Sequence, residues 1–93
     1  MKLQDRFDLT GQVAVVTGAG RGIGEGIALD FAEAGASVVL AARRTDEITA
    51  VADRINARGG NAIAVRTDVT DDDAVSALGQ AAVDNFGSLT IWV

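Results

Sequence analysis

The fold of this chain is decided by Val13-Ala14-Val15-Val16-Thr17-Gly18-Ala19-Gly20-Arg21-Gly22-Ile23-Gly24. An apolar, β-branched run ends at Thr17, glycines follow at every second position, and a helical pattern then begins. Because glycine has no Cβ, a phosphate can approach the backbone N–H groups at the start of the helix, where the helix dipole favours an anion. The stretch therefore predicts a phosphate-binding loop. A tight strand-to-helix turn whose glycines only permit close packing remains the alternative at this point.

The rest of the chain alternates between strand and helix patterns. Apolar runs and the amphipathic segments between them predict strands over residues 12–17, 37–42, 62–67 and 89–93 and helices over 22–34, 45–58 and 70–86. Strand–helix–strand units with short connections make right-handed crossovers, which bring the strands into one parallel sheet. The expected fold class is α/β, half of a doubly wound parallel sheet, βαβαβαβ along the chain with strand order 3-2-1-4.

The expected helices carry signals at both ends. Thr45 fits the N-cap of the second helix, and Asp46 and Glu47 in its first turn favour the helix dipole. Thr70 opens the third helix, with Asp73 in the manner of a capping box. The helices should end at Gly35, Gly59-Gly60 and Gly87, and should bury apolar faces made of Ile23, Ile27 and Phe31, of Ile48, Val51, Ala52 and Ile55, and of Val75, Leu78, Ala82 and Phe86.

The composition describes an acidic globular chain without cysteine or histidine. The 93 residues carry 13 acidic and 8 basic side chains, and the net charge of −5 argues against a binder of nucleic acid or of an anionic membrane. The missing cysteine excludes disulfides and thiolate metal sites, and the missing histidine removes the commonest general base. No apolar run approaches the ~18 residues of a membrane span. We expect a cytoplasmic protein without a metal site.

Four segments together resemble one known family. The glycine stretch from Thr17 resembles the T-G-x-x-x-G-x-G cofactor signature of the short-chain dehydrogenase/reductase family. Gly35-Ala36-Ser37-Val38-Val39-Leu40 is similar to that family's entry into the second strand, Asp68-Val69-Thr70 to the segment after its third strand, and Phe86-Gly87-Ser88-Leu89 to the approach to its fourth strand. The resemblance covers essentially the whole chain. It implies a Rossmann-like fold and an enzyme that interconverts a carbonyl and a secondary alcohol with a nicotinamide cofactor.

The resemblance also implies which residues hold that cofactor. The pyrophosphate would lie on the glycine loop, the Asp68 carboxylate would accept from the adenine amino group, and the Val69 N–H would lie near the ring. Asp68 competing with Thr70 to cap the next helix remains an alternative. The implied cofactor-binding residues are Gly18, Gly20, Arg21, Gly22, Ile23, Gly24, Arg43, Arg44, Asp68 and Val69.

The basic residues in this set favour NADP(H) over NAD(H). A carboxylate accepts a hydrogen bond from the adenosine 2′-hydroxyl but repels a 2′-phosphate, and a guanidinium does the reverse. After the second strand, the chain has Ala42 followed by Arg43 and Arg44, and Arg21 directly precedes Gly22. We expect Arg21 and Arg43 to read the phosphate and Arg44 to face water. A solvated arginine pair at a strand end is the alternative.

No catalytic residue can be assigned from the resemblance. The family's Asn, Ser, Tyr and Lys set corresponds to positions beyond this sequence, and the chain has no tyrosine and a single lysine, Lys2. Thr90 also stands where the family usually has aspartate, and Trp92 where a smaller aliphatic is usual. We therefore expect residues 1–93 to be the N-terminal part of one dinucleotide-binding domain, truncated before the catalytic segment. The family implies a small-molecule carbonyl or alcohol substrate and a homotetramer or homodimer. A non-catalytic dinucleotide-binding or redox-sensing module remains the alternative function.

Overall fold

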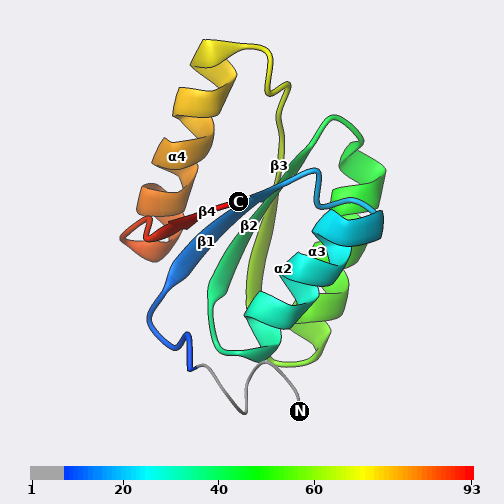
Figure 1. Cartoon of the computed structure of the whole chain (residues 1–93), viewed down its shortest axis with the longest axis vertical. Helices are drawn as coiled ribbons and strands as arrows, with labels where there is room; N and C mark the ends of the chain where they lie inside the picture. Colours follow the sequence, from blue (N-terminus) through cyan, green and yellow to red (C-terminus); the bar gives the residue numbers. More distant parts are fainter. Residues whose placement is uncertain (1–7) are drawn as a thin grey trace.

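The computed structural model describes residues 8–93, which form one parallel sheet with helices on both faces (Figure 1). The strands lie in the order β3-β2-β1-β4 and all three pairings are parallel, so the predicted α/β class and strand order 3-2-1-4 are confirmed. The elements along the chain are β1 (Val13–Thr17), α2 (Gly22–Glu33), β2 (Ser37–Ala42), α3 (Thr45–Ala57), β3 (Asn61–Arg66), α4 (Asp72–Phe86) and β4 (Ile91–Trp92).

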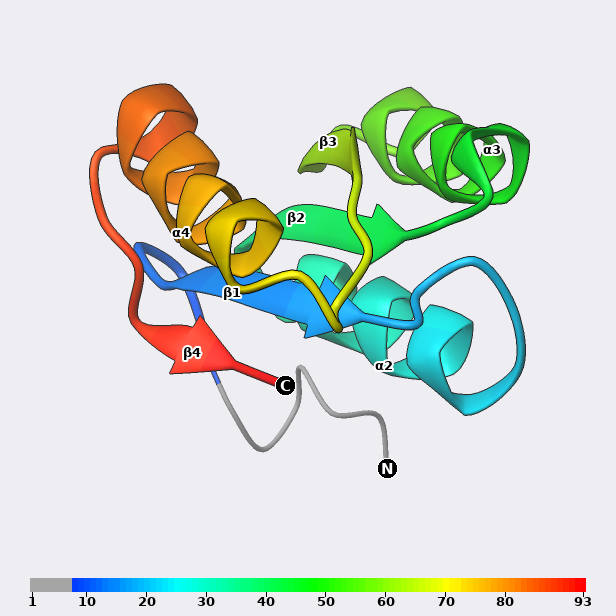
Figure 2. The same cartoon turned by 90° about the horizontal axis from the view of Figure 1, so that it is seen from above.

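The central strands β1 and β2 are buried on both faces. Alternate side chains of a strand point to opposite faces, so each strand contributes to two separate cores. Val16, Val38 and Leu40 pack with α2 and α3, whereas Val15 and Val39 pack with α4. Helices α2 and α3 therefore cover one face of the sheet and α4 covers the other (Figure 2). This two-sided burial explains why neither strand alternates with polar residues.

The apolar faces of α3 and α4 are largely as predicted, but one residue of α2 is not. All four predicted residues of α3 are buried, and α4 buries Leu78 and Ala82. In α2, Ile23 is 84% exposed, so its assignment to the core is wrong, and the fully buried residue is Ala28. Ile23 lies in the first turn of α2, next to the glycine loop, and belongs to neither of the two buried clusters.

Both predicted N-caps are displaced by one residue. Thr45 is the first residue of α3, and its N-cap is Arg44, which makes no capping hydrogen bond with its side chain. The N-cap of α4 is Asp71, whose carboxylate accepts from the backbone N–H groups of Asp73 and Ala74. The three helix ends predicted from glycines are confirmed, with backbone φ angles of +106° at 35, +86° at 59 and +85° at 87.

The cap at Asp71 supplies a direct test of this assignment. We expect Asp71→Ala to lower the free energy of unfolding by about 1 kcal/mol, because two N–H groups lose their acceptor. The neighbouring Asp72→Ala should cost only a few tenths of a kcal/mol, since that carboxylate contributes through the helix dipole alone. Urea denaturation of the two variants distinguishes them. Equal losses would contradict the cap.

The strand β4 is shorter than the predicted 89–93, but its hydrogen bonds to β1 continue on both sides. The Thr90 hydroxyl accepts from Val13 N at 2.8 Å and donates to Val13 O at 3.2 Å. Val93 N donates to Val15 O at 2.8 Å, and Val93 O accepts from both the N–H and the hydroxyl of Thr17. Trp92 lies against α4 beside Gly79, where an added Cβ would make an ordinary van der Waals contact with the indole ring at 3.7 Å. Both departures from the family pattern are thus accommodated locally.

Candidate functional site

The carboxyl edge of the sheet holds all the predicted cofactor residues, in three connections and in the first turn of α2 (Figure 1). Residues 18–21 join β1 to α2, residues 43–44 join β2 to α3, and residues 67–71 join β3 to α4. Because parallel strands end at the same edge, these connections lie side by side above β1, β2 and β3. In open α/β sheets ligands bind at this edge.

The glycine loop is held tightly against the start of α2. Gly24 allows the closest approach, since a Cβ there would lie 2.1 Å from the carbonyl oxygen of Gly18. Ala19 is fully buried, and its N–H donates to Ala41 O of β2 at 3.3 Å. Gly18 and Gly22 both have φ of +65°, a conformation that favours glycine, and a Cβ at either would face open space. The loop is therefore fixed on its inner side and open on its outer side.

The N-terminus of α2 is free to receive an anion. The first N–H groups of a helix have no partner within the helix. At α2 the N-cap Arg21 is extended and makes no capping hydrogen bond with its side chain. Glu25, the acid of the first turn, is paired with Arg54 of α3. Uncapped N–H groups beside an open glycine loop suit a phosphate. The residues at this helix start therefore fit the pyrophosphate of a dinucleotide cofactor.

Each arginine of the candidate site has a carboxylate partner, each pair is long, and each guanidinium is exposed. Such pairs contribute little on their own, so the guanidinium groups remain available to a phosphate. The atom distances are 3.9 Å for Arg21 Nε to Glu47 Oε2, 3.5 Å for Arg43 Nη2 to Asp68 Oδ1, and 3.4 Å for Arg44 Nη2 to Asp46 Oδ2. The structure thus brings Arg43 together with Asp68, whereas Arg44 is 67% exposed and pairs with an acid of its own helix turn.

Asp68 is fixed by Thr70 and caps no helix. Its Oδ1 accepts from Thr70 N at 2.9 Å and from Thr70 Oγ1 at 2.6 Å. Neither residue caps α4, since Asp71 does. The hydroxyl and the N–H of Thr70, and then Arg43, lower the pKa of Asp68 below its usual value of 3.8. The carboxylate is therefore ionised at neutral pH and can only accept hydrogen bonds. Beside it, the Val69 side chain is 56% exposed.

The Thr70 hydroxyl gives a prediction for the pH dependence of this pair. Because Asp68 has a lower pKa in the folded state than its usual 3.8, its contribution to stability is present above that pH and is lost as the pH falls through the folded value. Thr70→Val removes the largest cause of the shift, so we expect the pKa of Asp68 to rise toward 3.8. A carboxyl-carbon NMR titration measures it. An unchanged midpoint in the variant would contradict the role of the hydroxyl.

Glu47 also lies at this edge, although the sequence predicts for it only a favourable interaction with the helix dipole. A Cβ at Gly20 would lie 2.9 Å from the Cβ of Glu47 and 3.3 Å from its Oε1. The first turn of α3 therefore packs against the glycine loop. The sequence shows that an acid stands in the first turn of the helix after the second strand. It does not show that this acid contacts the glycine loop, which lies far earlier in the chain.

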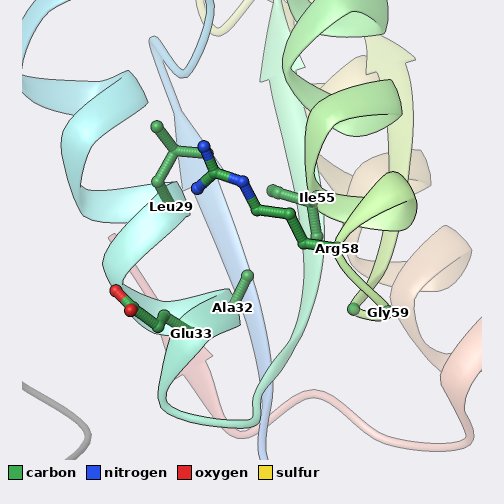
Figure 3. A pocket seen from close by; sticks show the side chains of 7 residues that line it. Leu29, Ala32, Glu33, Ile55, Arg58 and Gly59 are labelled. Atoms are coloured by element: carbon green, nitrogen blue, oxygen red, sulfur yellow. The ribbon is translucent and has the colours of Figure 1, made fainter.

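A cavity of about 430 Å³ lies at the opposite end of α2 and α3 (Figure 3). Arg58 extends from the end of α3 toward Leu29 of α2 there. None of the predicted cofactor residues lines it. Within residues 8–93, no cluster of three acidic or metal-ligating side chains could hold a metal ion, and no helix is long and apolar enough to cross a membrane.

Comparisons with known proteins match nearly all of the chain. A family model described as short chain dehydrogenase matches residues 12–93. The chain is 44% identical over 89 residues to the 7alpha-hydroxysteroid dehydrogenase of Escherichia coli K12, covering 96% of this chain and 35% of that protein. A crystal structure of hydroxysteroid dehydrogenase from Escherichia coli superimposes with a TM-score of 0.91 at 43% identity, over 95% of this chain and 36% of the other. A metagenomic short-chain oxidoreductase in complex with NADP gives a TM-score of 0.85 at 41% identity, over 91% and 38%. This chain spans about a third of the length of these relatives.

Proposed function

The chain belongs to the short-chain dehydrogenase family, and from that premise we propose that it is the cofactor-binding part of an NADP(H)-dependent oxidoreductase. The reaction would interconvert a carbonyl and a secondary alcohol. The observation that carries this proposal is the edge where an open glycine loop, an uncapped helix N-terminus and two exposed arginines lie together. The relatives compared above are oxidoreductases, which favours an enzyme over a non-catalytic sensor.

The proposed roles follow the geometry of the edge. The backbone of the glycine loop and the N–H of Ile23 would hold the pyrophosphate at the start of α2. Asp68 would accept from the adenine amino group, beside the exposed Val69. Within this set, Gly24 supports the loop through its contact with Gly18, and Gly20 leaves room for the first turn of α3. When bound, the nicotinamide supplies or accepts two electrons and a proton; the residues described here bind and orient the adenosine end.

The preference for NADP(H) rests on the charges at the end of β2. Ala42 ends the strand, so no carboxylate stands there for a ribose hydroxyl. Arg43 follows directly, and Arg21 of the glycine loop pairs with Glu47 in the first turn of the next helix, α3. A guanidinium binds a phosphate through strong, charge-assisted hydrogen bonds. The NADP complex of the metagenomic relative supports the same preference.

The wider properties of the protein are proposed from the family and the composition. Residues 1–93 would form the N-terminal part of a single dinucleotide-binding domain, and no catalytic residue is assigned among them, since they include no tyrosine or histidine. The substrate would be a small carbonyl or alcohol, and the assembly a homotetramer or homodimer. A cytoplasmic location is proposed on the basis of the acidic, cysteine-free composition.

Equilibrium titration of the protein with NADPH and NADH, followed by cofactor fluorescence, tests the proposal. We expect NADPH to bind at least about ten times more tightly, because one charge-assisted pair contributes roughly 1.5–3 kcal/mol. Equal affinities would contradict the NADP(H) preference. Failure of both cofactors to bind would contradict the dinucleotide site itself.

A further inference from the structure

One acid stands against the glycine loop at the place where the 2′-phosphate would have to lie. Glu47, in the first turn of α3, packs on Gly20, whose missing Cβ leaves the room for it. Its Oε2 lies 3.9 Å from Nε of Arg21. The Glu47 side chain is 25% exposed, against 83% for Arg21. The acid is therefore the more buried partner of the pair, packed on the loop, and the arginine is the more exposed one.

We propose that Glu47 is a specificity-determining residue that weakens the preference of this site for a 2′-phosphorylated adenosine. The inference rests on the proposed function, in which Arg21 reads the phosphate. A phosphate that contacts Arg21 would come within a few ångströms of the Glu47 carboxylate, and two negative groups at that separation repel each other. Glu47 also lies 3.9 Å from the guanidinium that the phosphate needs, and it competes weakly for that group. Both effects oppose NADP(H) and leave NAD(H) untouched.

The neighbouring acids differ from Glu47 in what they contact. Asp46 is 71% exposed and pairs with Arg44 within its own turn of α3. Asp68 is held by two hydrogen bonds from Thr70 and pairs with Arg43. Only Glu47 among these three approaches both Gly20 and Arg21. Asp46 therefore supplies a matched control, since it carries the same charge in the same helix turn.

The test uses two ligands that differ only in the 2′-phosphate, adenosine 2′,5′-bisphosphate and adenosine 5′-monophosphate. Calorimetric titration of the protein gives both dissociation constants without any contribution from the nicotinamide. We expect Glu47→Gln to bind the bisphosphate about five times more tightly than the unaltered protein, because a repulsive charge and a competitor for Arg21 are both removed. Binding of the monophosphate should change by less than about two-fold, because that ligand brings no charge to the position.

The control variant and the unaltered protein distinguish a failure of the proposed role of Glu47 from a failure of the binding site itself. Asp46→Asn should change both constants by less than about two-fold, because its carboxylate pairs only with an exposed arginine. An unchanged preference in Glu47→Gln, or an equal gain in Asp46→Asn, overturns the role of Glu47 while the site itself stands. If the unaltered protein binds neither ligand, the proposed function fails and this inference fails with it.

Discussion

Replacing Gly24 with alanine is expected to abolish dinucleotide binding and to lower the free energy of unfolding by about 3 kcal/mol. A Cβ at this position would lie 2.1 Å from the carbonyl oxygen of Gly18, 2.7 Å from its carbonyl carbon and 3.3 Å from Cα of Ala19. All three atoms belong to the backbone, so no side chain can rotate away. Helix α2 has to move off the glycine loop, and the N–H groups at its start lose their position. Urea denaturation and NADPH titration measure the two effects.

Gly26→Ala is the matched control for this substitution. Gly26 lies two residues further along the same helix, and a Cβ there would meet no atom within 4 Å. Because alanine is a better helix former than glycine, this variant should gain up to about 1 kcal/mol of stability. Its affinity for NADPH should stay unchanged. If Gly24→Ala behaved like Gly26→Ala, the close contact between helix and loop would be contradicted.

Arg43→Ala is expected to weaken NADPH binding by about 10- to 100-fold, the loss of one charge-assisted pair with a phosphate. NADH, which has a hydroxyl where NADPH has the 2′-phosphate, should bind with less than about a three-fold change, because Arg43 offers that hydroxyl only an exposed contact. The Arg43 guanidinium lies 3.5 Å from Asp68, and the pair is exposed, so its removal should not unfold the chain. Titration with the two cofactors gives the ratio directly.

Substitution of two further arginines distinguishes a local contact between Arg43 and the phosphate from the effect of removing a positive charge anywhere. Arg58→Ala removes the same charge at the far end of α3, beside the cavity, and should change neither affinity by more than about two-fold, since exposed charges that far apart are screened. Arg44→Ala should cause a smaller loss than Arg43→Ala, because Arg44 pairs with Asp46 in its own turn. Equal losses of NADPH and NADH affinity in Arg43→Ala would contradict its contact with the phosphate.

The sheet could be predicted from the sequence because its determinants are local. The unbroken apolar runs of β1 and β2 indicate strands buried on both sides, and short crossovers leave one handedness and one order. Helix faces were predictable where a strand lies beneath them, as for Leu78 and Ala82. Ile23 has the right spacing but lies in the first turn of α2, outside both buried clusters, and spacing alone does not show which turns of a helix are covered.

The helix starts and the pairing of charges were less predictable. Residues 70–73 offer a run of chemically similar caps. Asp71 takes the role, and the Thr70 hydroxyl donates to Asp68 instead. The glycine loop and the arginines follow from a contiguous motif. The contact of Glu47 with that loop joins segments that lie far apart in the chain, so only the folded structure reveals it.

The central claim is that a dinucleotide binds at the glycine loop, and backbone amide chemical shifts of the isotopically labelled protein test it most directly. On addition of NADP⁺, we expect the largest shifts at residues 18–24, with further shifts at Arg43, Asp68 and Val69. Residues lining the cavity at the other end of α2 and α3, such as Arg58 and Gly59, should not change. Shifts confined to that cavity, or no shifts in residues 18–24, would contradict the account.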